Sequence, residues 1–430
     1  MAAEDGPVSS ADERAISSAD EGTARDVLAS RDFRILFLAS FASNTGRWMQ
    51  QVVLGIFAWK LTGSSRFLGL VIFAQMGPML FLSIVGGSLA DTIDRRRLLV
   101  VSQAWQATWG LVLAWQVADE QISRAGLLGL VALIGVGQAL YAPAFTAVLP
   151  SVAGRRNLSA AISLNAAQVN GSRVIGPAIG AWMASRFGTA EVFAINAASY
   201  VFVIGALLVV EIPAVRSKST SASDRLLGGF RLAKASPQVG LPLVTMATFA
   251  AFCLPFIGQM PALAALNLGV EPDSSTYGLL YATFGMGALV GAISVGTVLA
   301  KVPKPKVVRA TLGLFAVSLA ALALVRSPTP AYVAFFFVGL FYFTMPVALS
   351  TFLQQHLADE VRGRVMALWT LSFAGVIALS NSIMGALVEV TSITAVALGG
   401  AAVAGIMALV VRLEAGPVVG EELLTRRSLE

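Results

Sequence analysis

Two arginines, Arg47 and Arg173, interrupt long apolar stretches of this 430-residue sequence. An arginine at the centre of a bilayer costs about 2.5–3.5 kcal/mol on insertion scales, so such a residue must face protein or water. Other polar side chains stand in the same stretches, several of them at the spacing that places residues on one face of a helix. The resulting candidates for a substrate cavity are Asn44, Arg47, Gln51, Gln138, Tyr141, Asn170, Arg173, Gln259 and Tyr342. The alternative for this set is hydrogen bonding between helices.

Arg173 has two interpretations. It lies one turn after Asn170, whereas Gln168 and Ser172 point to another side of the same helix. A helix that is polar on two sides is surrounded by protein. Arg173 therefore either attracts an anionic substrate or pairs with helix carbonyls as a structural support, and the sequence leaves both open.

No carboxylate interrupts the middle of an apolar stretch, because all 24 acidic residues lie in tails, loops or the ends of stretches. Proton coupling would therefore use the rim, with Asp91 as the first candidate and Glu191 and Glu389 as weaker ones. The single histidine, His356, is expected to be interfacial, and the single cysteine, Cys253, to be a small core residue. The sequence contains no metal-ligand cluster, no nucleophile paired with a base and no phosphate-binding loop for ATP. We expect neither enzymatic activity, nor a cofactor, nor a bound metal.

The elements that must position these side chains are membrane helices. Apolar residues make up 56% of the chain and charged residues 13%, with a mean hydropathy of +0.76. Stretches long enough to cross the hydrocarbon core, about 20 residues each, occur at 35–59, 67–90, 98–117, 126–149, 159–185, 192–210, 240–267, 277–300, 308–325, 331–354, 366–388 and 393–411. The sequence predicts an all-α polytopic membrane protein with twelve transmembrane helices.

The stretches 35–59 and 159–185 are rich in polar residues, and loop charges decide that they cross the membrane. When both cross, Lys and Arg gather in the inside loops, as the positive-inside rule requires. The outside connections then hold only Arg66, Arg124, Arg186 and Arg326, with Lys60 at a helix end. Both termini are predicted to be cytoplasmic. The net charge of +6 follows from this topology and indicates no nucleic-acid partner.

A shift of 209 residues aligns the two parts of the chain: Gly69 falls on Gly278 and Arg95 on Lys304. Such a repeat is one way to build a transporter with its site midway through the membrane. The expected organisation is an acidic disordered tail at 1–31, a six-helix bundle at 32–212, a cytoplasmic linker at 213–239, a second bundle at 240–412 and a cytoplasmic tail at 413–430.

The segment Gly87–Arg97, with sequence GSLADTIDRRR, resembles the signature of the major facilitator superfamily between helices two and three. It departs from that pattern at Thr92 and Asp94. The segment Asp359–Met366, DEVRGRVM, looks like a signature of the branch that holds siderophore exporters and macrolide efflux proteins. The resemblance implies a latch that closes the cytoplasmic side, built from Gly87, Asp91, Arg95, Arg96, Arg362, Gly363 and Arg364. The alternative is that both basic runs anchor loops to anionic lipid.

The third motif is Gly176-Pro177-Ala178-Ile179-Gly180. Small residues let membrane helices touch closely, and proline bends a helix. The segment resembles the Gly-Pro motif of antiporter members of the superfamily, which implies a conformational role for Gly176, Pro177 and Gly180. Simple packing between helices is the alternative.

The resemblance covers about residues 32–412 and implies a secondary active exporter in the bacterial inner membrane. Its substrates would be small amphipathic molecules such as drugs, antibiotics or siderophore-like products, moved by alternating access and coupled to protons. The expected partners are the substrate, protons and membrane lipid, and the chain is expected to be monomeric. An uptake permease of the same fold is the main alternative. A membrane-embedded enzyme, a receptor and a channel are further ones.

Overall fold

The computed structural model describes residues 23–154, 156–212, 222–414, 416, 418 and 419. Within these ranges the side chains of 81, 83–92, 147, 150, 159, 222–226, 359 and 360 are not described. The predicted latch residues Gly87 and Asp91 therefore lie outside the described side chains, although both positions belong to a helix.

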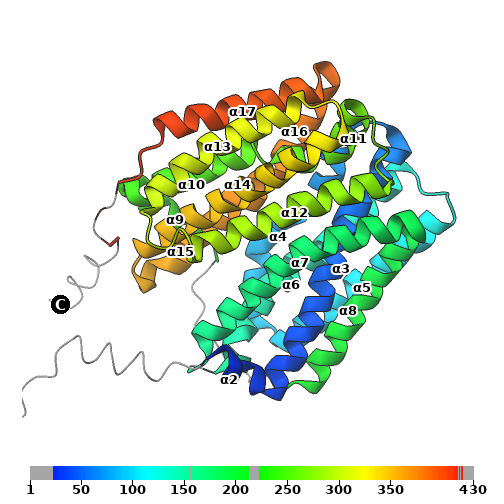
Figure 1. The fold of residues 1–430 in the computed structure, drawn as a ribbon. Coiled ribbons are helices and arrows are strands. Elements are labelled where there is room, and N and C mark those ends of the chain that lie inside the picture. Colours follow the sequence, from blue (N-terminus) through cyan, green and yellow to red (C-terminus); the bar gives the residue numbers. More distant parts are fainter. Residues whose placement is uncertain (1–22, 155, 213–221, 415, 417, 420–430) are drawn as a thin grey trace, which may run out of the picture.

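The first part of the chain forms six long helices: α3 (Arg31–Thr62), α4 (Ser65–Thr92), α5 (Arg95–Ala118), α6 (Arg124–Ala153), α7 (Leu158–Arg186) and α8 (Thr189–Val209). The second part forms α10 (Pro237–Phe252), η1 (Pro255–Ile257), α11 (Met260–Leu268), α12 (Ser275–Gly296), α13 (Lys304–Leu324), α14 (Pro328–Gln355), α15 (Asp359–Thr370), η2 (Leu371–Gly375), α16 (Val376–Val390) and α17 (Ile393–Val410). Because α10 with α11 and α15 with α16 each make one traverse, the described chain traverses the bundle twelve times (Figure 1). This confirms the predicted fold class.

In the described part of the chain, nine helices are long and apolar enough to cross a membrane by composition alone. The two polar stretches, α3 and α7, are not among them. Both are nevertheless continuous helices, of 32 and 29 residues. At 1.5 Å per residue they are about 48 and 44 Å long, which exceeds the hydrocarbon core of about 30 Å. Their polar side chains are accommodated because α3 and α7 pack on each other.

Two of the predicted spans are not regular helices. The stretch 240–267 is broken into α10, η1 and α11, with Pro255 at the start of η1 and Pro261 in the first turn of α11. Proline lacks the amide hydrogen that a continuous helix needs, so the break falls at these positions. The stretch 366–388 contains a π-helical turn, η2, where the backbone hydrogen-bond spacing widens.

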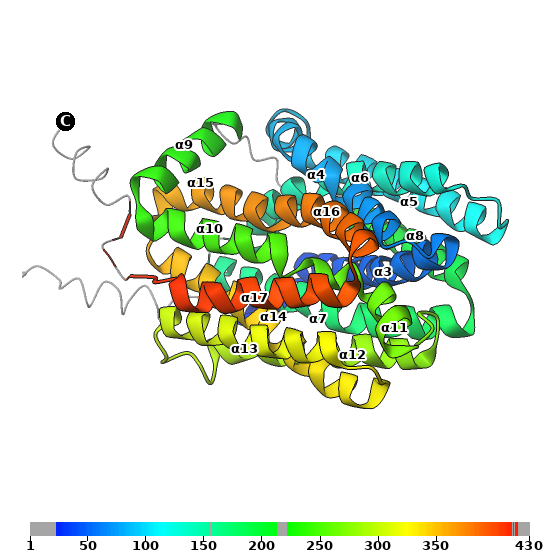
Figure 2. The same ribbon diagram turned by 90° about the horizontal axis from the view of Figure 1, so that it is seen from above.

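Two short helices lie beside the bundle. The end of the expected disordered tail forms α2 (Ala24–Ala29), whose first turn is held by a capping box between Thr23 and Asp26. The backbone amide of Thr23 donates to Asp26 at 2.8 Å, and this bond lowers the pKa of that carboxyl. Inside the expected linker, α9 (Ala222–Ala235) packs against α15 and α10 (Figure 2).

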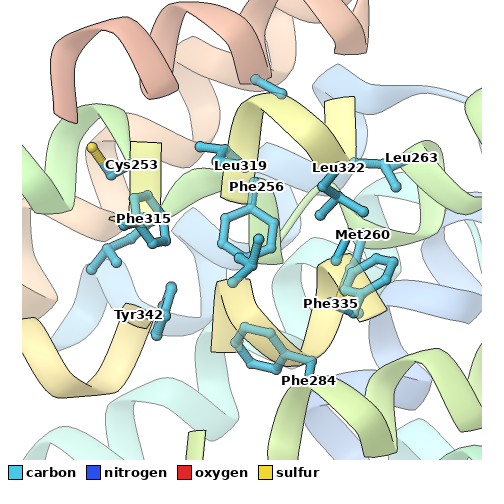
Figure 3. Packing of buried hydrophobic residues seen from close by; sticks show 14 of the residues in the cluster. Cys253, Phe256, Met260, Leu263, Phe284, Phe315, Leu319, Leu322, Phe335 and Tyr342 are labelled. Carbon is cyan, nitrogen blue, oxygen red and sulfur yellow. The ribbon is translucent and has the colours of Figure 1, made fainter. Parts of the chain in front are cut away.

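Each set of six helices packs mainly with itself. In the first, α3 packs on α7, α4 on α6 and α5 on α8; in the second, α12 packs on α14 and α13 on α17. The core of the second set is aromatic. Phe256, from the broken span, sits between Phe315 and Tyr342, with ring centroids 6.4 and 5.8 Å away (Figure 3).

The two sets meet tightly at one end, at the loops that follow α3, α11 and α16, and we call this the closed end. A Cβ on Gly69 of α4 would lie 2.2 Å from the carbonyl oxygen of Asn381 in α16. Side chains add ties across the closed end: Lys60 pairs with Asp273, and the Ser64 hydroxyl donates to Glu389. At the opposite end of the bundle, α2 and α15 lie apart (Figure 1).

Candidate functional site

The predicted cavity residues with the strongest chemistry lie halfway along their helices. The midpoint of α3 falls between Gly46 and Arg47, and that of α7 is at Ser172, next to Arg173. The midpoint of α14 falls between Phe341 and Tyr342. A spanning helix has its midpoint near the bilayer centre, so both arginines are held at mid-membrane depth.

Arg47 contacts two residues of its own helix. Its Nη2 donates to the Oδ1 of Asn44 at 3.1 Å, and its guanidinium carbon lies 5.9 Å from the ring centroid of Trp48. Cations near the face of an indole ring are attracted by its quadrupole. Asn44 and Trp48 therefore both contact the Arg47 guanidinium.

Arg173 lies beside the same tryptophan and reaches the second set of helices. Its guanidinium carbon is 5.3 Å from the ring centroid of Trp48 and 5.6 Å from that of Phe343 in α14. The phenol of Tyr342 is also close enough to interact with it. Arg173 thus stands where the two sets of helices face each other at mid-depth.

Neither of the two arginines has a carboxylate partner in the described structure, and the ion pair of Lys60 with Asp273 lies away from them at the closed end. The Nε of Arg173 is buried without a hydrogen-bond partner, and so is the indole Nε1 of Trp48. Arg173 and Trp48 therefore each present a buried, unpaired hydrogen-bond donor beside two positive charges.

The Gly-Pro motif positions this cluster by bringing α3 and α7 together. A Cβ on Gly176 would lie 2.6 Å from the Cβ of Trp48 and 2.7 Å from the carbonyl oxygen of Thr45. A Cβ on Gly180 would lie 2.7 Å from the Cα of Met49. Only glycine permits this approach, and it sets Arg173, one turn before Gly176, beside Trp48. Pro177 is buried in the same helix.

Polar pairs fix the rest of α3. The Ser172 and Thr45 hydroxyl oxygens are 3.2 Å apart, and Asn196 of α8 donates from its amide to the Oε1 of Gln50. Asn196 also contacts the hydroxyl of Tyr200 at 3.1 Å, and Tyr200 lies near Arg47. These bonds attach α3 to α7 and α8 within the first set.

Tyr141 and Gln138 occupy α6, one turn apart. The Tyr141 ring stacks on Phe145 with centroids 5.3 Å apart, and Tyr141 is close enough to Arg47 to interact with it. Gln138 is half-buried, as is Asn170, one turn before Arg173 on α7. The structure thus gathers Asn44, Arg47, Tyr141, Arg173 and Tyr342 near one another.

Two predicted cavity residues lie instead toward the closed end. Gln51 lines a small cavity of about 30 Å³ with Gly258 and Tyr277. Gln259 is buried, and its Nε2 donates to the carbonyl oxygen of Ser65 at 3.2 Å. Gln259 therefore links the two sets of helices there, as the hydrogen-bonding alternative for these residues predicts.

The predicted latch residues lie at the end opposite the closed end, where several contacts of their arginines are described. Arg96 donates to the carbonyl of Val210 at the end of α8. Arg362 donates to the carbonyl of Leu357 at 3.3 Å, and Arg364 packs against Gly228 of α9. Arg95 begins α5, and Gly363 is exposed in α15.

Two residues near the site, Phe343 and Asn196, were not predicted from the sequence. Phe343 could not be predicted, because the sequence does not distinguish it from the other phenylalanines of the same apolar stretch. Asn196 carries the signal that was available, a polar side chain in the middle of an apolar stretch. The sequence does place Trp48 on one helix face with Asn44 and Arg47, but its position between two arginines depends on how α7 packs.

Residues 24–424 match the model of the family described as transmembrane secretion effector. The chain belongs to this family. Among curated proteins it is 27% identical over 368 residues to the enterobactin exporter EntS of Salmonella choleraesuis (strain SC-B67), covering 83% of this chain and 85% of that protein. It is 26% identical over 367 residues to EntS of Escherichia coli O1:K1 / APEC, with the same coverage.

Solved structures of major facilitator transporters share the fold. The nucleoside transporter NupG aligns with a TM-score of 0.68 at 13% identity, over 87% of this chain and 96% of NupG. A bacterial homologue of the human lysosomal transporter Spinster, solved in an inward-facing and unoccupied conformation, aligns with a TM-score of 0.65 at 15% identity, over 87% and 93% of the two chains. This member of the transmembrane secretion effector family is a multi-pass membrane transporter of major facilitator type, and its relatives are transporters rather than enzymes.

Proposed function

We propose that this transporter exports small amphipathic molecules of the drug, antibiotic or siderophore-like class from the bacterial cytoplasm across the inner membrane by alternating access. The observation that carries the proposal is a polar cluster at mid-depth, Arg47, Trp48 and Arg173 with Phe343, shared between two sets of six helices. Curated relatives named as enterobactin exporters support the direction of transport.

The packing of the two sets supports alternating access. The two sets touch through glycines at the closed end, where a Cβ on Gly69 or Gly385 would meet backbone oxygen at 2.2 or 2.4 Å. Both termini are proposed to be cytoplasmic, so that the closed end faces outward. In this arrangement the site would exchange substrate with the cytoplasm, and separation of the glycine contacts would open it to the outside.

Coupling to protons is part of the proposal. The middle of the membrane has no carboxylate, so the proton would be carried at the rim. Asp91 is the first candidate from the sequence. Glu389 is the second, because its carboxylate accepts from the Ser64 hydroxyl and from the Arg66 amide at 3.1 Å. Protonation of the Glu389 carboxylate would weaken its hydrogen bonds across the closed end. The proposed working unit is a monomer in contact with lipid.

A pair of assays tests the direction and the coupling. A strain lacking the gene is exposed to a panel of siderophores and antibiotics, and intracellular accumulation is measured; loss of the transporter should raise accumulation of the substrate. Everted vesicles should then take up that substrate when energised, and an uncoupler should stop the uptake. Accumulation in right-side-out vesicles would instead identify an uptake permease.

A further inference from the structure

We propose that the pair Arg47 and Arg173 binds an oxyanion on an aromatic body, so that the transported molecule is an organic anion. This inference rests on the transport function proposed above and adds the charge and shape of the substrate. It also separates the two interpretations of Arg173 that the sequence leaves open.

Two buried donors of the site lack a hydrogen-bond acceptor. Arg173 Nε and Trp48 Nε1 are buried donors without partners, and Arg47 bonds to one amide oxygen, that of Asn44. Buried polar groups in native proteins are almost always paired, and leaving one unpaired is unfavourable. Both orphaned atoms can only donate, so the missing group is an acceptor.

The two positive charges of the site favour the binding of an anion. The two guanidinium carbons each lie within 6 Å of the Trp48 ring centroid, so the two positive charges are at most about 11 Å apart. The described structure places no carboxylate against either of them, and the sequence has no acidic residue in the middle of any span. A ligand oxyanion would offset two charges that the protein leaves uncompensated.

Cationic side chains with a structural role elsewhere in this protein donate hydrogen bonds to backbone carbonyl oxygens. The ammonium group of Lys304, also buried, donates to the carbonyl oxygens of Val295, Leu299 and Ala300 at 3.3, 2.8 and 3.2 Å. Arg309 reaches the carbonyl oxygen of Ala408 at 2.8 Å. Arg173 makes no such bond to a carbonyl of the described chain; its contacts are two aromatic faces. The structure therefore favours a ligand-binding role for Arg173.

The aromatic rings beside Arg173 favour a particular body for the charged group. Trp48 belongs to the first set of helices and Phe343 to the second, so a flat apolar group near Arg173 would meet rings from both. Guanidinium groups recognise planar oxyanions such as carboxylates through paired N–H donors. An aromatic carboxylate, sulfonate or phenolate meets both requirements.

The first test compares two ligands of the same shape, one anionic and one neutral. The full-length protein in lipid nanodiscs is titrated by calorimetry with 1-naphthoate and with the neutral 1-naphthamide, which share the ring system. The carboxylate should bind at least tenfold more tightly. Equal affinities would overturn the inference even if export is established, whereas failure of export in the vesicle assays would leave the affinity ratio unaffected.

The second test assigns the preference to the two arginines. In a variant carrying Arg47→Gln and Arg173→Gln, naphthoate should bind no more tightly than the amide, while the affinity of the amide changes less than threefold. Arg34→Gln on α3 and Arg186→Gln on α7 are controls, because both residues are exposed near the ends of the same helices. Arg173→Lys keeps the charge and should retain part of the preference. A double variant that still discriminates would overturn the assignment.

Discussion

Substitution of Gly69 by alanine should shift the transporter away from the closed-end conformation. In the structure a Cβ at this position would lie 2.2 Å from the carbonyl oxygen of Asn381 and 2.9 Å from the Cα of Ser382. These are backbone atoms of α16, which cannot move aside as a flexible side chain can. When the two sets of helices separate at this end the clash disappears, so the methyl group penalises one conformation only.

The size of the shift follows from the cost of overpacking. An extra methyl group in a well-packed contact costs about 1–3 kcal/mol. Since 1.4 kcal/mol is about a tenfold change in an equilibrium constant, Gly69→Ala should lower the closed-to-open ratio at this end roughly 5- to 150-fold.

Cysteine labelling measures the shift. Gln51 lines the small cavity at the closed end, and Gln51→Cys, in a Cys253→Ala background, reports whether a membrane-impermeant maleimide added outside can enter. Adding Gly69→Ala should raise its labelling rate. Two controls separate a change of state from a loss of packing: Gly129→Ala meets nothing within 4 Å, and Gly287→Ala clashes with Phe336 inside one set of helices.

Gly129→Ala should leave both the labelling rate and the melting temperature unchanged. Gly287→Ala should lower the melting temperature without raising labelling from outside. The contrary result is that Gly69→Ala lowers the melting temperature without raising the labelling rate, as Gly287→Ala should. The contact between α4 and α16 would then be ordinary packing, and it would not be a contact that separates when the transporter opens outward.

Three further changes test single parts of the structure. Glu389→Gln removes the charge of the carboxylate but keeps an oxygen that can accept from Ser64 and Arg66, and an intramolecular hydrogen bond contributes about 0.5–1.5 kcal/mol, so outside labelling should rise less than tenfold; an unchanged rate would show that Glu389 is not part of the closure. Asn196→Ala leaves Gln50 without its partner and should destabilise the protein by about 0.6–2 kcal/mol, measured by thermal unfolding. Lys304→Met removes the ammonium group that donates to three backbone carbonyl oxygens. The melting temperature should fall, while naphthoate affinity stays the same.

Most of the fold could be predicted from the sequence, because twelve apolar stretches leave few arrangements. Composition alone was insufficient for α3 and α7, whose polar side chains lower their hydropathy. The alternation of Lys and Arg between loops supplied the missing information, since it requires both stretches to cross. The break at Pro255 was not predicted, because prolines are tolerated in membrane helices and their number does not show which one interrupts the chain.

The candidate site could be predicted in part. Arg47 and Arg173 stand out because charge is expensive at mid-membrane depth. Their common neighbour Trp48 and the cross-set contact with Phe343 depend on how α3, α7 and α14 approach, which periodicity within one helix cannot show. Gln259 carried the same polar signal as the arginines, yet it binds the carbonyl of Ser65, because an amide at mid-span serves helix packing as readily as a ligand.

Alternating access is tested most directly by two spin-label distances, each recorded with and without an exported substrate. Labels at Gln121 and Val390 report the closed end, and labels at Ile93 and Val298 report the opposite end; all four side chains are exposed. Substrate should increase the populations with a long distance at the closed end and a short distance at the opposite end. Distances that change together, or that stay fixed while transport proceeds, would contradict a site opened to each side in turn.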